Sequence, residues 1–186
     1  MHKWSEARYG DYILRVVHDG KNYHILLLET TPKVGTTKTS EEVVHLSAGF
    51  ISDELFVIGD IQGNGYFSCG LKGKGIGTLL VNVMLSILKK AGCGETEVKG
   101  DLTHAGDPDE PTLAQKCKED RERFWQSFGF SIVPIPRCDQ IRAKVKDLRV
   151  VSKPAVFGVV PNCPDLSDLQ PINRDDYGGD WFRFAK

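Results

Sequence analysis

The sequence predicts an α/β fold with a mixed β-sheet, and three observations lead to that class. Four strand-like segments come first in the chain, and none of them shows helical periodicity. A glycine-rich segment and an amphipathic helix follow them. A strand, a second helix and two further strands complete the order, which is typical of a mixed sheet flanked by helices.

The four N-terminal strands are predicted from apolar, β-branched runs that turn signals separate. Residues 18–22, His-Asp-Gly-Lys-Asn, form a turn cluster between the first two runs, which is typical of a β-hairpin. Residues 30–40 are rich in threonine and are expected to form a loop. A short turn at residues 52–54 joins the last two runs. The four predicted strands are residues 12–17, 23–29, 43–51 and 55–61.

Glycine is concentrated just before the first predicted helix, because six of the 19 glycines lie in residues 63–77. From Ile76 to Leu88, apolar residues recur at spacings of three and four, which places them on one face of a helix. Two lysines and a glycine end this pattern and suit a helix C-terminus. The helix is therefore expected over residues 78–91.

Residues 72–78, Lys-Gly-Lys-Gly-Ile-Gly-Thr, are a candidate anion site at the start of that helix. Glycines let the backbone approach a ligand closely, and the free N–H groups of a helix start attract negative charge. Lys72 and Lys74 add positive charge, so phosphate or pyrophosphate is the expected ligand. The Gly-Lys-Ser/Thr ending of a Walker loop is missing. A glycine-rich turn with solvated lysines is the alternative interpretation.

The second half of the chain is predicted to alternate between strand and helix. Thr112-Leu113-Ala114-Gln115 matches a capping box, so the second helix is expected to begin there. The three remaining predicted strands are residues 95–103, 130–135 and 144–151. These elements place residues 1–153 in one domain. Residues 154–186 are expected to be an extension, either packed on that domain through its C-terminal aromatic residues or partly disordered.

Composition excludes several classes of function. A net charge of -1, from 24 basic and 25 acidic residues, disfavours nucleic acid as a partner. No apolar run approaches the roughly 18 residues of a membrane span, and the first residues lack an apolar signal core, so a cytoplasmic protein is expected. The five cysteines are dispersed and none has the spacing of a zinc site, so no metal is expected.

Three features together resemble the GNAT superfamily of acetyl-CoA-dependent N-acetyltransferases. Residues 72–77 look like the family's pyrophosphate loop, Gln/Arg-x-x-Gly-x-Gly/Ala, with Lys72 in the place of Gln or Arg. The long apolar-faced helix follows where the family has its central helix. Phe124-Trp125-Gln126-Ser127-Phe128-Gly129-Phe130 resembles the family's Phe-Tyr-x-x-Leu-Gly-Phe. By element order the resemblance covers about residues 12–152.

The resemblance implies an α+β type of fold, with a mostly antiparallel, seven-stranded sheet flanked by helices. The helices that the family usually places between its first two strands are absent here. It also implies that acetyl-CoA binds and that the strand before the loop splays from its neighbour around the pantetheine arm. The implied cofactor-binding residues are Lys72, Gly73, Lys74, Gly75, Ile76, Gly77, Thr78 and Trp125.

The acid and base residues depart from the family pattern. Trp125 stands where the family usually has a tyrosine acid, and an indole N–H is not a practical acid. Asp60, late on the fourth predicted strand, lies about where some members place a carboxylate. His104 ends the fifth predicted strand, and the pKa of imidazole suits proton transfer. Asp60 and His104 are the candidate catalytic residues. An ordinary turn aspartate and a non-catalytic histidine are the alternatives.

Two functions follow from the resemblance. The first is transfer of an acetyl group from acetyl-CoA to a primary amine, by direct attack within a ternary complex. A peptide or protein amine is favoured, because a short turn between the first two predicted strands leaves the acceptor cleft open. The second is a catalytically weak or inactive module that binds CoA or a protein partner. No membrane partner is expected, and a homodimer stays open.

Overall fold

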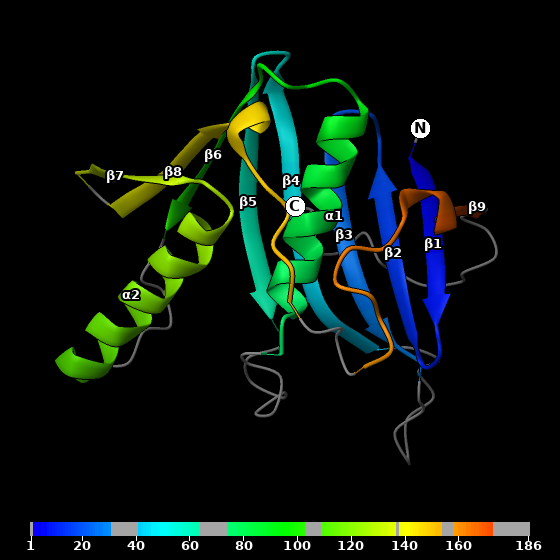
Figure 1. The fold of residues 1–186 in the computed structure, drawn as a ribbon, viewed down its shortest axis with the longest axis horizontal. Helices are drawn as coiled ribbons and strands as arrows, with labels where there is room; N and C mark the ends of the chain where they lie inside the picture. The colour runs from blue at the N-terminus through cyan, green and yellow to red at the C-terminus, as the bar shows by residue number, and fades with distance from the viewer. Residues whose placement is uncertain are drawn as a thin grey trace.

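The computed structural model describes residues 2–30, 41–63, 74–102, 109–136, 138–153 and 158–172. In these residues one nine-stranded sheet carries two α-helices, α1 (Ile76–Lys90) and α2 (Pro111–Ser127), as Figure 1 shows. The expected mixed α/β class is therefore confirmed. The strands are β1 (Lys3–Tyr9), β2 (Tyr12–His18), β3 (Asn22–Glu29), β4 (Glu41–Ser52), β5 (Leu55–Gly63), β6 (Glu97–Leu102), β7 (Ser131–Ile135), β8 (Cys138–Lys144) and β9 (Gln170–Ile172).

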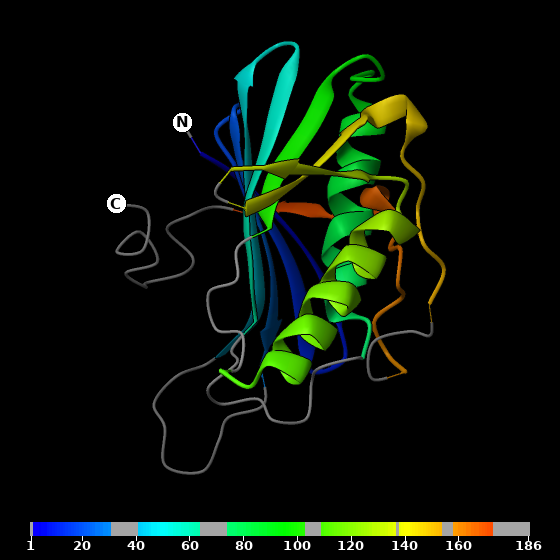
Figure 2. The same cartoon turned by 90° about the vertical axis from the view of Figure 1, so that its left-hand side faces the viewer.

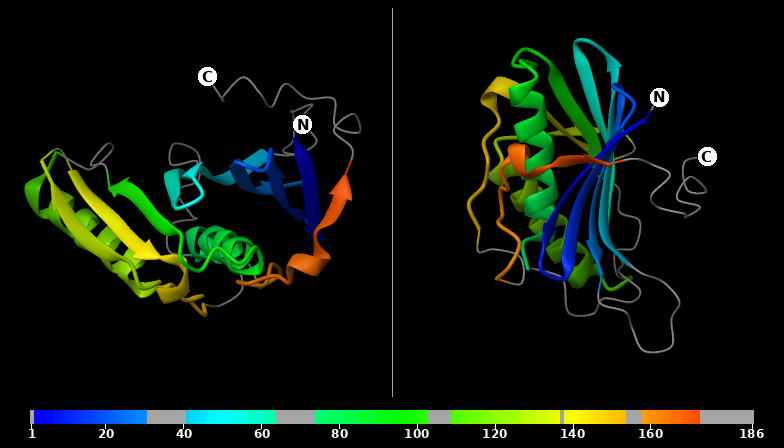
Figure 3. Two further views of the ribbon diagram at one scale, coloured as in Figure 1. Left: turned by 90° about the horizontal axis from the view of Figure 1, so that it is seen from above. Right: turned by 90° about the vertical axis from the view of Figure 1, so that its right-hand side faces the viewer.

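The sheet is antiparallel except at one position. Its strand order is β7-β8-β6-β5-β4-β3-β2-β1-β9, and β5 and β6 are the parallel pair among the described strands. Parallel neighbours need a crossover connection, and α1 lies between them in the chain. Both helices lie on the same side of the β1–β5 part of the sheet (Figures 2 and 3).

The number of strands is corrected from seven to nine, because β1 and β9 were not expected. In β1 only Trp4 and Ala7 are buried, and charged residues interrupt the alternation that would reveal a strand. One of these, Glu6, forms a salt bridge of 3.1 Å with the buried Arg15 of β2. Strand β9 has only three residues, which pair with β1.

The strand expected at residues 144–151 is also wrong. The real strand, β8, begins at Cys138 and ends at Lys144, and a 3-10 helix, η1 (Val145–Asp147), follows it. The apolar residues that suggested the strand are buried without lying on one, because Val145 is in η1 and Leu148 follows it. An apolar run alone does not separate these two cases.

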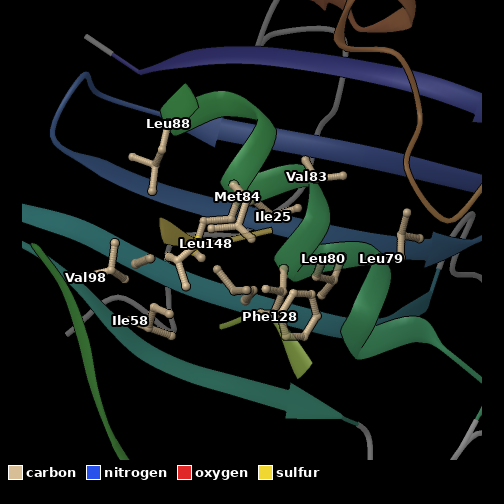
Figure 4. Close-up of a cluster of buried hydrophobic side chains, with 14 of the residues drawn as sticks. Ile25, Ile58, Leu79, Leu80, Val83, Met84, Leu88, Val98, Phe128 and Leu148 are labelled. Carbon is tan, nitrogen blue, oxygen red and sulfur yellow. The ribbon is translucent and has the colours of Figure 1, made fainter. Parts of the chain in front are cut away.

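Helix α1 is buried on nearly all sides, although its sequence predicts one apolar face. Ten of its 15 residues are buried, and its apolar side chains meet those of β3, β5, β6 and the end of α2 in the main core (Figure 4). Its outer side is covered by residues 148–153 and 158–172, here called the strap, which crosses the helix on its way to β9 (Figures 1 and 3).

The Asn82 side chain joins α1 to the strap through hydrogen bonds. It is fully buried, and its Nδ2 donates to the carbonyl oxygens of Val151 at 2.9 Å and Asn162 at 2.8 Å. Its Oδ1 accepts from the N–H of Val151 at 3.0 Å. A buried amide is stable here because its donors and acceptor are all satisfied by strap backbone.

Replacing Asn82 with alanine is expected to lower the free energy of unfolding by about 2–4 kcal/mol, because buried carbonyl and N–H groups of the strap lose their partners. Urea unfolding measures the loss, and hydrogen exchange in residues 158–172 should rise.

Ser86→Ala, one turn along the same helix, is the matched control. It removes a hydroxyl that donates to the carbonyl of Asn82 within the helix and makes one exposed contact of 3.6 Å with Cys163 Sγ of the strap, and it should cost less than about 1 kcal/mol. Equal losses in the two variants would contradict the role of Asn82 in holding the strap.

Candidate functional site

The sheet splits between β5 and β6. Their parallel ladder runs from Leu55–Glu97 to Ile58–Gly100 and ends there, while β5 continues to Gly63 and β6 to Leu102. Seen from above, β6 and β8 turn away from the plane of β4 and β5 (Figure 3). The main-chain groups of β5 past the split have no β6 partner among the described residues, so this edge can pair with a ligand.

A β-bulge lies at the split. Ala48 of β4 pairs with Ile58 and the preceding Ser47 pairs with Asp60, so Gly59 is one extra residue in β5. A bulge bends its strand and increases the local twist, which turns β5 away from its parallel neighbour. Gly100 allows the last close contact before the separation, because a Cβ there would lie 3.1 Å from the carbonyl oxygen of Ile58.

The N-terminus of α1 lies at the end of the sheet where β5 finishes (Figure 1). Gly75 caps the helix in the left-handed conformation, with φ of 84°, and the first helical bond runs from the N–H of Leu79 to its carbonyl. The N–H groups of residues 76–78 therefore have no acceptor within the helix. The first turn holds no acidic residue, and Lys74 just before it is exposed. This end of α1 suits an anion.

The predicted loop residues have different surroundings. Lys72 and Gly73 lie outside the described residues. Ile76 and Thr78 are buried, so their backbone rather than their side chains is available to a ligand. A Cβ on Gly77 would lie 3.5 Å from the ring of Phe124, so this glycine faces α2.

The two candidate catalytic residues are placed only in part. Asp60 lies in β5 beside the bulge, opposite Ser47 of β4, and its side chain is not among those that the structure describes. His104 lies outside the described residues. Their roles stay predictions.

Trp125 is a core residue. Only 6% of its surface is exposed, and its ring packs against Phe124 and Phe130 with centroid distances of 5.1 and 5.4 Å. The aromatic motif at the end of α2 thus holds this helix against the core. The start of α2 differs from the expected capping box, because the Glu110 carboxylate accepts from the N–H groups of Thr112 and Leu113. A contact between Trp125 and a cofactor stays a prediction.

A histidine pair, which the sequence analysis did not single out, lies on the face of the sheet away from α1. Nδ1 of His24 in β3 and Nε2 of His45 in β4 are 2.9 Å apart, a hydrogen-bond distance. Burial lowers the pKa of His24, nearby His45 and His2 lower it further, and Asp19 opposes them. The available sequence signal was the alternation of these histidines with buried apolar neighbours such as Ile25 and Leu46.

A hollow of about 590 Å³ lies on the same face. It reaches from His24 in β3, past Ser47 in β4, to Val57 and Gly59 in β5, so it ends at the split. Its volume is in the range of small-ligand sites. Its other lining residues are His2, Asp19, Asn22, Ala48, Gly49 and Ile51.

The described residues contain no cluster of three or more His, Cys, Asp or Glu side chains that could hold a metal ion. Neither described helix has the length and apolar character that crossing a membrane requires.

No protein-family model and no curated protein matches the chain. A crystal structure of a proposed acetyltransferase of the GNAT family from Desulfovibrio desulfuricans is similar to it, with a TM-score of 0.42 and 12% sequence identity. The similarity covers 69% of this chain and 72% of that chain. Likeness at this level does not assign the chain to a family.

Replacing Gly75 with alanine is expected to lower the free energy of unfolding by about 1 kcal/mol, because a Cβ strains the left-handed backbone that begins α1. Urea unfolding measures the change. Gly94→Ala is the control, because its Cβ would meet only Lys146 Cβ at 3.8 Å, and it should change stability by less than about 0.5 kcal/mol. An unchanged free energy of unfolding in Gly75→Ala would contradict the proposed backbone strain.

Proposed function

We propose that this protein transfers an acetyl group from acetyl-CoA to a primary amine. The observation that carries the proposal is the split of the parallel β5–β6 ladder, with the start of α1 at the same end of the sheet. Coenzyme A has a pyrophosphate and an extended arm with amide groups. A helix start binds the first, and an open strand edge hydrogen-bonds the second.

The pyrophosphate lies on the backbone amides of residues 72–78. Gly75 lets the chain enter the helix in the left-handed conformation, and the N–H groups of residues 76–78 donate to the phosphate oxygens. Lys72 and Lys74 neutralise part of its charge. The pantetheine arm runs along β5 past Ile58, which brings the thioester to the split beside the bulge.

The acceptor amine attacks the thioester carbonyl directly while both substrates are bound. Asp60 and His104 are candidates for taking the proton from the ammonium. Trp125 stands where the family resemblance would place a tyrosine acid, and its indole is buried in the core. The leaving thiolate therefore takes its proton from another group. The first two predicted strands, β2 and β3, are joined by residues 19–21 in place of helices, which supports a peptide or protein amine as the acceptor.

A module that binds CoA without turnover is the second candidate, and the buried Trp125 favours it. Such a protein would keep the anion site and the open strand edge while lacking a proton donor for the thiolate. Tight binding of the cofactor with no transfer to any amine would identify it.

Reversing the charge of Lys74 is expected to weaken acetyl-CoA binding about tenfold, because a glutamate beside the helix start repels the pyrophosphate. Isothermal titration calorimetry at low salt measures the dissociation constant. Lys90→Glu makes the same change of net charge at the other end of α1 and should leave the affinity unchanged. Absence of binding by the unaltered protein, or equal losses in the two variants, would refute the site.

Valine at Gly75 is expected to abolish acetyl transfer, because it combines backbone strain with bulk at the amides that hold the pyrophosphate. Release of the CoA thiol with peptides carrying lysine or a free N-terminus measures turnover. Gly92→Val is the matched control. Gly92 follows the C-terminal end of the same helix and also has a positive φ, of 76°, and a Cβ there would meet open space. Transfer should persist in that variant. Equal inactivation of both would argue for a general loss of structure.

A further inference from the structure

We propose that the hollow on the face away from α1 binds the acceptor amine, and that His24, hydrogen-bonded to His45, accepts the proton of its ammonium group. This inference rests on the acetyl transfer proposed above and assigns the second substrate a place and a base, His24 in place of the candidates Asp60 and His104. His24 is the catalytic residue in this arrangement, and His45 is a positioning residue.

The direction of approach follows from burial at the split. On the α1 side, Phe56 and Ile58 of β5 and Leu80 of α1 are buried in the main core, so β5 is closed to a substrate from there as far as the split. The hollow lies on the opposite face, and one of its walls is Gly59, which follows the last residue of the parallel ladder. A thioester held at the open edge of β5 is therefore reached from the hollow.

The histidine pair is placed between β3 and β4 in the same region. Across the sheet His24 pairs with Ser47, and Ser47 pairs with Asp60 of β5 beyond the bulge. His45, on the same face, pairs with Leu26 on one side and Gln62 on the other. The pair therefore lies level with the residues of β5 that follow the split.

The hydrogen bond between the rings gives His24 its role. When Nδ1–H of His24 donates to Nε2 of His45, the lone pair on Nε2 of His24 is left to accept a proton. Burial, His45 and His2 all lower the pKa of His24, so the ring is neutral at pH 7 and ready to act as a base.

Asp19 defines the class of acceptor. Its carboxylate lines the hollow and accepts from the N–H groups of Lys21 and Asn22 and from the Asn22 side chain, at 2.7 to 2.9 Å. These hydrogen bonds lower the pKa of Asp19, so it stays ionised. A fixed negative charge beside an exposed Ile51 suits an alkyl ammonium group on a peptide, with its carbon chain on the apolar rim.

The ammonium gives one proton to Nε2 of His24, and the freed lone pair forms a C–N bond at the thioester carbonyl. Collapse of the tetrahedral intermediate breaks the C–S bond, and the thiolate takes the second proton from the new C–N nitrogen. The products are the amide and CoA thiol, and His24 returns its proton to water.

Bromoacetyl-CoA tests the arrangement without knowledge of the acceptor. It places an electrophilic carbon where the acetyl methyl group would lie, one bond from the thioester carbonyl, and an imidazole within reach displaces bromide. Peptide mapping by mass spectrometry should find the label on His24 in the unaltered protein, and free CoA should suppress it. His24→Asn should lose the label. His18→Asn, on the neighbouring strand and outside the hollow, should keep it.

A pH profile tests His45. His45 lowers the pKa of His24, so the labelling rate of His45→Asn should reach its midpoint at higher pH than in the unaltered protein. The variant leaves the other polar side chains of this hollow in place, namely those of His2, Asp19 and Ser47.

The outcomes separate the two proposals. If calorimetry shows no CoA binding, acetyl transfer is refuted and this inference falls with it. If CoA binds but the label is absent or lies on another residue, including His2 or a cysteine, only the role of the histidine pair is overturned. An unchanged pH midpoint in His45→Asn would remove His45 from the arrangement.

Discussion

The burial of α1 on two sides is the constraint on which the rest of the structure depends. One side of the helix fills the core over the sheet, and the strap covers the other, with the buried Asn82 amide satisfied by strap backbone. Helix α1 connects the parallel strands β5 and β6 in the chain. Its burial between the core and the strap therefore also fixes where the first turn of the helix lies relative to the split. A helix covered on one side only would leave the buried residues of its outer side, such as Asn82, in water.

The split and the hollow share a single cause in the backbone. The extra residue at Gly59 ends regular pairing on the β6 side of β5 and also forms a wall of the hollow on the opposite face. One irregularity therefore opens the sheet between β5 and β6 and shapes its surface. The core covers the other face of β5 at Phe56 and Ile58, so the proposed reaction has its two substrates meet at one strand.

Periodicity was sufficient to predict α1, the hairpin of β2 and β3, and the mixed class of the sheet, since their apolar residues follow regular spacings. It did not find β1, whose Glu6 is neutralised by an arginine on another strand. The glycines before α1 are the basis of the proposed anion site. The His24–His45 pair depends on the register of β3 and β4, which no local pattern specifies, and Trp125 proved to be core only once α2 was packed.

The pairing of β1 with β9 has a consequence for the order of folding. Strand β1 can form its hairpin with β2 early in synthesis, but its outer edge gains a partner only when residues 170–172 emerge from the ribosome. Until then the sheet presents an unpaired edge next to the second apolar cluster around Trp4 and Ile13. Completion of the sheet is thus tied to the last described element of the chain, so a nascent chain released early would expose a surface prone to aggregation.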